Sequence, residues 1–111
     1  MHPLIEENRT AIEALCQEFG IEKLEVFGSI VTNAFDDESD VDFIVHLPDG
    51  FDYGPWGSRF FSIEERLSDM LGRDVDVLSS TSVARKNIYF RRQADATRRA
   101  IFDASQIGIT A

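Results

Sequence analysis

The feature that most constrains the fold of this chain is a segment of alternating polar and apolar residues that carries two acidic side chains. In the segment Asp40 to Leu47 (DVDFIVHL), apolar residues recur at every second position, which is typical of a strand with one buried face. The valine and phenylalanine side chains then face the core, and Asp40 and Asp42 lie together on the opposite face. His46 shares the face of the two acids, but a lone histidine is predicted to be a structural or surface residue rather than a metal ligand. We therefore predict a strand at the border of the core that presents two carboxylates side by side.

A second strand is predicted before it in the chain. The run Leu24 to Phe27 (LEVF) is mostly apolar and is followed by Gly28 and Ser29, which interrupt a strand. Ser29 is a suitable N-cap for a short helical turn through Asn33. Because backbone N–H groups converge where a strand gives way to a helix, this Gly-Ser turn is a candidate anion site.

The remaining pattern alternates helices with short strands. Two apolar stripes at helical spacing are ended by Gly20 and Gly72, and the second stripe is expected to place Phe60 and Phe61 in the core. The expected elements are helices over residues 3–19, 60–71 and from 82 onward, strands over 24–27, 40–47, 74–78 and 99–102, and a long loop over 48–57.

The composition excludes several classes of protein. The chain has 111 residues, of which 43% are hydrophobic, so one domain over residues 1–111 with a modest core is expected. A net charge of −9 argues against binding of nucleic acid or an anionic membrane by charge alone. The single Cys16 excludes an internal disulfide, and no segment has the pattern of a signal peptide or a membrane span. We expect a soluble, cytoplasmic protein.

The charge is unevenly distributed along the chain. Residues 1–80 hold 18 acids and five bases, whereas residues 81–111 hold six bases and two acids. Arg85, Arg92 and Arg99 recur every seven residues and would lie along one side of a continuous helix. Such a helix face is either solvated or a source of positive charge for a bound phosphate, and the sequence leaves both readings open.

A third acid completes a pattern that suits one chemistry. Asp76 lies within the predicted strand over 74–78, and Asp74 at its start is the alternative. Mg²⁺ prefers hard carboxylate oxygens, and two such ions can activate a hydroxyl and stabilise a departing pyrophosphate. Asp40, Asp42 and Asp76, placed after a phosphate-binding turn, therefore predict transfer of a nucleotidyl group from a nucleoside triphosphate.

The spacing of these residues resembles that of a known family. Gly28-Ser29, ten intervening residues and the Asp-Val-Asp run that ends at Asp42 match the pattern of the minimal nucleotidyltransferases in the DNA polymerase beta superfamily. The later run LSDMLGRDVDVL is similar to the family's third acidic strand and aligns its acid with Asp76. The resemblance covers the chain from Leu24 to about Phe102. It implies an α+β, two-layer fold in which helices pack against a small mixed sheet, in agreement with the predicted elements.

The resemblance also implies a site and its cofactors. Two Mg²⁺ ions and ATP, or another nucleoside triphosphate, are the expected cofactor and substrate. The catalytic and metal-binding residues would be Asp40, Asp42 and Asp76, and the phosphate-binding residues would be Gly28 and Ser29.

The chain departs from the family pattern after the Gly-Ser turn. Family members commonly carry an arginine there, whereas this chain has Ile30 to Asn33 and no basic residue until Arg59. Either the triphosphate is neutralised by metal ions and by arginines of the basic C-terminal region, or the chain binds triphosphate weakly and has become a binding protein. The candidate arginines are Arg91, Arg92 and Arg99.

The family resemblance implies a protein partner. Small members are often paired with a HEPN-domain protein, a toxin that cleaves RNA, and act as its antitoxin by transferring AMP to a partner tyrosine. Phe51, Tyr53 and Trp56 in the predicted loop are aromatics that could dock such a partner or stack on a base. The alternatives are a non-catalytic antitoxin or interaction module that retains the fold, and a transferase that acts on a small molecule. A homo-oligomer is also open.

Overall fold

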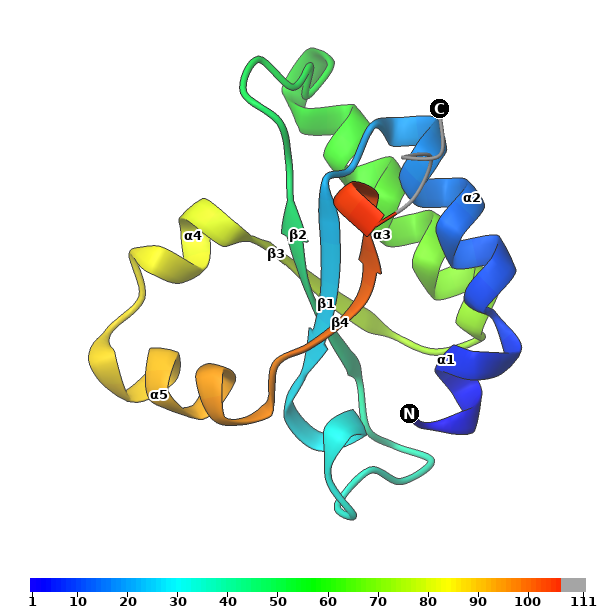
Figure 1. Cartoon of the computed structure of the whole chain (residues 1–111), viewed down its shortest axis with the longest axis vertical. Coiled ribbons are helices and arrows are strands. Elements are labelled where there is room, and N and C mark those ends of the chain that lie inside the picture. The colour runs from blue at the N-terminus through cyan, green and yellow to red at the C-terminus, as the bar shows by residue number, and fades with distance from the viewer. Residues whose placement is uncertain (107–111) are drawn as a thin grey trace.

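The computed structural model describes residues 1–106 and places a four-stranded sheet between two groups of helices (Figure 1). The strands lie in the order β3-β2-β1-β4. β1 pairs antiparallel with β2 and with β4, whereas β2 and β3 are parallel, so the sheet is mixed as expected. The predicted strands are confirmed with shifts of about one residue at their ends: β1 (Lys23–Phe27), β2 (Val41–His46), β3 (Val75–Ser79) and β4 (Arg99–Asp103).

The N-terminal segment forms two helices where the apolar pattern predicts one. α1 (Pro3–Glu7) and α2 (Arg9–Phe19) meet at Asn8, whose φ of −108° and ψ of 9° depart from helical geometry. The Asn8 side-chain amide donates a hydrogen bond to the Leu4 carbonyl at 2.8 Å, and such local bonds compete with a continuous helix. α2 ends as predicted at Gly20, with a φ of +70° that suits glycine.

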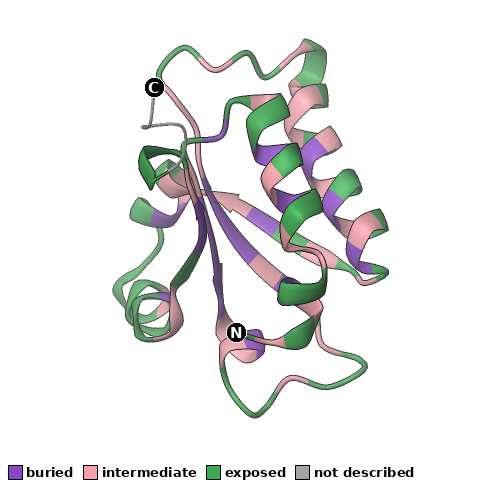
Figure 2. Cartoon of the chain, turned by 45° about the vertical axis from the view of Figure 1, so that its right-hand side comes forward, coloured by how far each residue is buried: buried purple, intermediate pink, exposed green. Residues whose placement is uncertain are grey.

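Helix α3 (Ser58–Leu71) covers one face of the sheet together with α1 and α2 (Figure 2). It follows a loop with one short turn, η2 (Pro55–Gly57), and ends at Gly72 as predicted. Phe61 is 62% exposed, so its predicted place in the core is wrong, because it lies one position outside the buried stripe of the helix. The core under these helices includes Ile5, Ile12, Leu15, Leu24, Val26, Val41, Phe43, Val45, Ile63 and Leu67.

The opposite face of the sheet carries a second, smaller group of helices. The pattern predicts one helix from residue 82 onward, but the structure has α4 (Ser80–Ala84) and α5 (Ile88–Thr97). Asn87 breaks the helix because its side chain caps α5 and accepts a hydrogen bond from the Phe90 N–H at 2.9 Å. A second core cluster of Phe27, Ile44, Val83 and Ala94 joins these helices to the strands.

The break between α4 and α5 separates the regularly spaced arginines. Arg85 follows α4, Arg92 lies within α5, and Arg99 begins β4. The seven-residue spacing therefore does not align them on one helix face. The basic region over residues 81–111 is described as far as residue 106, with a short turn, η3 (Ala104–Gln106), after β4. Within residues 1–106 no helix is long and apolar enough to cross a membrane.

Candidate active site

The predicted Gly-Ser turn lies directly after β1. The chain leaves the sheet at Phe27 and enters a short 3₁₀ helix, η1 (Gly28–Val31). Gly28 has a φ of +75°, which disfavours any residue with a side chain. Phe27, not Ser29, occupies the N-cap position, so the predicted cap is wrong, and Ser29 lies inside the turn. The Thr32 N–H closes the turn on the Ser29 carbonyl at 2.9 Å.

The Asp42 carboxylate lies against the backbone of this turn. Asp42 on β2 is the register partner of Phe27 on β1. A side-chain carbon added at Gly28 would lie 2.7 Å from Asp42 Oδ2, closer than such atoms approach in proteins. The absence of a side chain at Gly28 therefore lets the carboxylate reach the turn.

Asp76 lies beside Asp42 on the neighbouring strand. The two residues are partners in the parallel register of β2 and β3, where strands are about 4.8 Å apart. Asp76 is exposed on an edge strand, and Asp42 is half-buried. Asp74 precedes β3, and its carbonyl accepts a hydrogen bond from the Val41 N–H at 3.1 Å. The register thus brings Asp76, rather than Asp74, next to Asp42.

Asp40 comes just before β2, at the end of a loop that Arg73 holds in place. The Arg73 guanidinium donates hydrogen bonds to the carbonyls of Asp36 and Ser39 and stacks over the Phe35 ring, 4.6 Å from its centre. Asp40 itself is exposed. The position of its backbone therefore depends on an arginine that follows α3.

Negative charge accumulates where these residues meet. Burial raises the pKa of Asp42 to about 6, and the charges of Asp76 and Asp40 add to this effect. The charge of Asp76 also contributes, after burial, to a raised pKa at Glu64 on α3. The charges of Asp40 and Asp76 thus both act on Asp42, although the three residues come from separate parts of the fold.

Residues 9–107 match the family model described as a nucleotidyltransferase domain, which is nearly the whole chain. The chain belongs to the nucleotidyltransferase domain family. This nucleotidyltransferase is 30% identical over 81 residues to a relative from Methanocaldococcus jannaschii with the provisional name protein adenylyltransferase MJ0128, covering 73% of this chain and 76% of the relative. It is 35% identical over 69 residues to the protein adenylyltransferase MntA of Thermococcus cleftensis, covering 62% of this chain and 66% of that protein.

Solved structures share the fold of the nucleotidyltransferase. One is a chain in the complex of the tri-AMPylated HEPN toxin of Shewanella oneidensis with an MNT antitoxin, which matches 91% of this chain and 74% of its own length. Its TM-score is 0.60 at 17% sequence identity, so the likeness shows the fold alone. The α+β, polymerase-beta-type fold implied by the resemblance is confirmed, except that α4 and α5 cover the second face of the sheet, so the fold has three layers rather than the two expected.

The nucleotidyltransferase has carboxylate groups that suit Mg²⁺, but they do not form a complete coordination site. Among residues 1–106, no three His, Cys, Asp or Glu side chains converge into a metal-binding group. Asp42 and Asp76 are adjacent by register, and Asp40 acts on Asp42 through its charge. All three offer the hard carboxylate oxygens that Mg²⁺ prefers, and a divalent cation would neutralise their mutual repulsion. The donor set therefore fits Mg²⁺.

The backbone of the Gly-Ser turn is tied to α5 by a contact that the sequence pattern does not indicate. The Gly28 N–H donates a hydrogen bond to Thr97 Oγ1 at 2.8 Å. This N–H is therefore occupied in the structure, whereas the Ser29 hydroxyl has no hydrogen-bond partner within residues 1–106. No motif marks Thr97, because its relevance depends on how α5 returns to the sheet.

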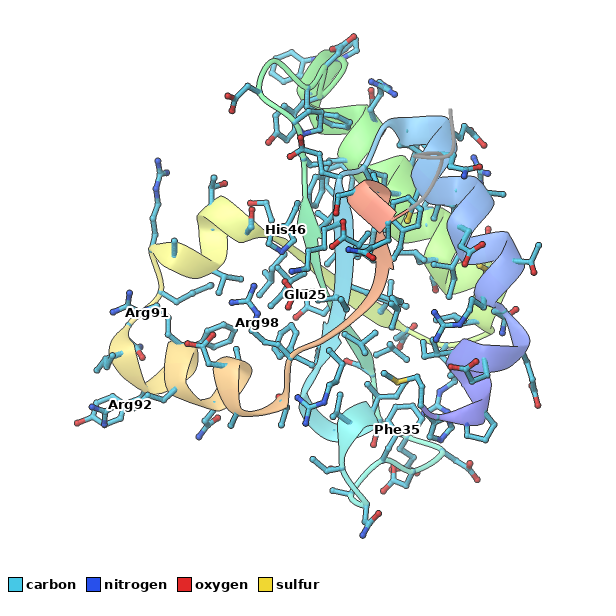
Figure 3. All side chains as sticks on the ribbon, viewed as in Figure 1. Glu25, Phe35, His46, Arg91, Arg92 and Arg98 are labelled. Atoms are coloured by element: carbon cyan, nitrogen blue, oxygen red, sulfur yellow. The ribbon has the colours of Figure 1, made fainter. Side chains whose placement is uncertain are left out.

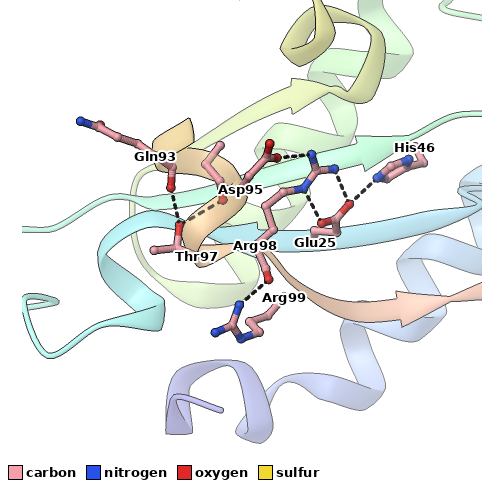
Figure 4. Close-up of polar contacts among 8 residues, drawn as sticks. Glu25, His46, Gln93, Asp95, Thr97, Arg98 and Arg99 are labelled. Carbon is pink, nitrogen blue, oxygen red and sulfur yellow. Dashed lines mark hydrogen bonds and ion pairs between the residues drawn. The ribbon is translucent and has the colours of Figure 1, made fainter. Parts of the chain in front are cut away.

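A partly buried ionic network holds the end of α5 against the sheet (Figure 4). Glu25 on β1 accepts hydrogen bonds from the Arg98 guanidinium at 2.7 and 2.8 Å, and contacts His46 at 2.5 Å. The hydrogen bonds from Arg98, and then those with His46, lower the pKa of Glu25 to about 2. Glu25 is 5% exposed. The sequence signal that could have identified this buried acid is its position as the single charged residue in the apolar run LEVF. His46 is structural, as predicted.

The basic side chains of the C-terminal region mostly lie away from the carboxylates. Arg91 and Arg92 are exposed on the outer side of α5 and point away from the strands (Figure 3). Arg98 is engaged with Glu25, and the Arg99 guanidinium donates back to the Arg98 carbonyl at 2.7 Å. Arg91 and Arg92 therefore lie away from the Gly-Ser turn, whereas Arg99 on β4 pairs with Val26, two residues before Gly28.

Proposed function

We propose that this nucleotidyltransferase transfers AMP from ATP to a hydroxyl of a HEPN-domain protein and thereby acts as the antitoxin of a toxin–antitoxin pair. The observation that carries the proposal is the register that pairs Asp42 with Asp76 while Gly28 admits the Asp42 carboxylate. Two relatives are named protein adenylyltransferases, and the fold is shared with a chain of an AMPylated HEPN toxin complex.

Asp40, Asp42 and Asp76 are the residues that would hold two Mg²⁺ ions. When bound, such ions would reduce the charge of the triphosphate and favour ionisation of the attacking hydroxyl. The burial of Asp42 beside the charges of Asp76 and Asp40 supports this assignment, because a bound cation would relieve the repulsion among these carboxylates.

The turn after β1 would seat the triphosphate. Ser29 supplies a free hydroxyl. Gly28 contributes by having no side chain, because its N–H already donates a hydrogen bond to Thr97 Oγ1. The missing arginine after this turn leaves the neutralisation of phosphate charge mainly to the cations held by the carboxylates.

Transfer would proceed by direct displacement at the α-phosphorus of ATP. A bond forms between the acceptor hydroxyl oxygen and the α-phosphorus, and the bond from that phosphorus to the β-phosphate oxygen breaks, releasing pyrophosphate. Asp76 would accept the hydroxyl proton, since it is exposed on an edge strand and an acceptor can approach it from outside the sheet.

The test is incubation with ATP labelled at the α-phosphate, Mg²⁺ and a purified HEPN-domain protein. We expect label in the HEPN protein, and a loss of at least about 100-fold in Asp42→Asn and Asp76→Asn. Asp49→Asn is the control, because Asp49 is an exposed loop carboxylate outside the site. Label that persists in Asp42→Asn contradicts the mechanism. A stable complex without any transfer favours the non-catalytic antitoxin instead.

A further inference from the structure

A row of adjoining hollows runs along the outer edge of β3 and ends at Asp40, one of the three candidate carboxylates. Three hollows of about 350, 360 and 550 Å³ lie in line, and each shares lining residues with the next. Phe61 lines the first and second hollows, and Asp74 lines the second and third. We name this surface the edge trough and define it by Tyr53, Phe61, Glu64, Glu65, Asp74 and Asp40.

The wall of the edge trough is a strand with one free side. In the described part of the chain, β3 pairs with β2 alone, so its other side offers backbone N–H and C=O groups to an added strand. Extended segments commonly bind proteins by pairing with such an edge. This edge therefore favours an extended occupant over a helical one.

One end of the edge trough is aromatic and exposed. Phe61 is 62% exposed, and Trp56, which precedes the lining residue Gly57 in the chain, is 98% exposed with a φ of +57°, an unfavourable conformation for a bulky residue. Neither ring is buried in the fold of the chain itself. Exposed aromatics that gain nothing from the fold are typical anchors for a partner protein.

The middle of the edge trough carries acidic side chains that have no basic partner in the described residues. Within residues 1–106, Glu64, Glu65 and Asp74 take part in no salt bridge. The nearby arginines have other contacts: Arg59 lies between the rings of Phe19 and Phe51, at 5.3 and 5.0 Å, and Arg66, also on α3, pairs with Glu18. An occupant with basic side chains would complement these acids.

We propose that the edge trough docks the acceptor protein through an extended, basic segment that places an apolar side chain against Phe61 and Trp56. The segment runs past Glu64, Glu65 and Asp74 and delivers its hydroxyl to the end of the trough at Asp40, whose charge acts on Asp42. This inference rests on the proposed function, since it gives the acceptor of that reaction a path to the site.

The first experiment detects docking without chemistry. Photoreactive p-benzoylphenylalanine replaces Phe61 in one sample and Tyr89 in another, because Tyr89 on α5 is a 74% exposed aromatic outside the trough. Each protein is irradiated with the same HEPN-domain protein, without ATP or Mg²⁺. We expect a covalent adduct from position 61 and none from position 89. The absence of an adduct at position 61, or an adduct between two copies of this chain, overturns the proposal.

The second experiment separates docking from catalysis. We expect Phe61→Ala and Glu65→Lys to raise the KM for the HEPN protein about tenfold and to leave the KM for ATP unchanged. Tyr89→Ala and Glu7→Lys are matched controls that retain both constants. Equal KM values for the HEPN protein in all variants overturn the docking site. If the wild-type chain transfers no label, the proposed function fails, and the adduct at position 61 still decides the docking site.

Discussion

The Thr97 hydroxyl accepts a hydrogen bond from the Gly28 N–H at 2.8 Å, so the last residue of α5 is tied to the first residue after β1. The Glu25–Arg98 pair anchors the chain immediately after Thr97. Helix α5 thereby holds the turn that is proposed to seat the triphosphate.

Loss of the Thr97 hydroxyl should weaken nucleotide binding. Thr97→Val keeps the shape of the side chain but leaves the Gly28 N–H without its partner, which should cost about 1 kcal/mol of unfolding free energy. We expect the KM for ATP to rise about tenfold. Thr97→Ser restores the hydroxyl and should restore both values. A KM for ATP that stays at the wild-type value in Thr97→Val would show that the tie does not matter for binding.

Gly28→Ala should inactivate the enzyme by displacing a carboxylate. The added carbon would lie 2.7 Å from Asp42 Oδ2, so we expect AMP transfer to fall about 100-fold. Gly20→Ala is the matched control, because Gly20 has a φ of +70° and an added carbon there meets nothing within 4 Å. Both variants should lose about 1 kcal/mol of stability through backbone strain. Equal activity in the two variants would refute the role of the close approach.

Arg73 should act as a positioning residue for Asp40. Arg73→Lys keeps the charge but cannot hold two carbonyls in the same way, so we expect the concentration of Mg²⁺ needed for half-maximal transfer to rise about tenfold. Arg66→Lys is the control, since Arg66 pairs with Glu18 on the surface. A fall in melting temperature with an unchanged Mg²⁺ requirement would assign Arg73 to stability alone.

The buried Glu25 network should make stability depend on acid pH. Because the pKa of Glu25 is about 2 in the fold and 4.5 ordinarily, the unfolded chain binds more protons between these values. The stabilisation is complete above about pH 4.5 and is lost as the pH falls toward 2, with a total of about 3 kcal/mol at most. Urea unfolding at several pH values should show a shallower dependence in Glu25→Gln. Glu18→Gln, which removes a solvent-exposed pair, should retain the wild-type slope.

Local patterns predict the elements of this fold more completely than they predict the site. Alternating residues locate β2, and Gly72 marks the end of α3, because both signals act within a few neighbouring residues. The apolar pattern does not predict the helix breaks at Asn8 and Asn87. Each break is caused by one side-chain hydrogen bond, which leaves the helical spacing of the apolar residues unchanged.

The contacts that support the site connect distant parts of the chain. Gly28 and Thr97 are 69 residues apart, and Glu25 and Arg98 are 73 residues apart. No periodicity records such pairs, because they depend on strand order and on the return of α5 to the sheet. The Asp-Val-Asp spacing was detectable because both acids belong to one segment, and Asp76 became the partner of Asp42 only through the parallel register.

The position of Asp76 on the free edge of β3 has a consequence for solubility. An unpaired edge strand invites strands from other molecules, and natural sheets deter this with charged side chains. Asp76 is such a charge at the second position of β3, so the carboxylate proposed for chemistry would also deter edge-to-edge association of the isolated protein. Removal of this charge therefore exposes the chain to aggregation, and self-association must be measured in any Asp76 variant before lost activity is assigned to lost chemistry.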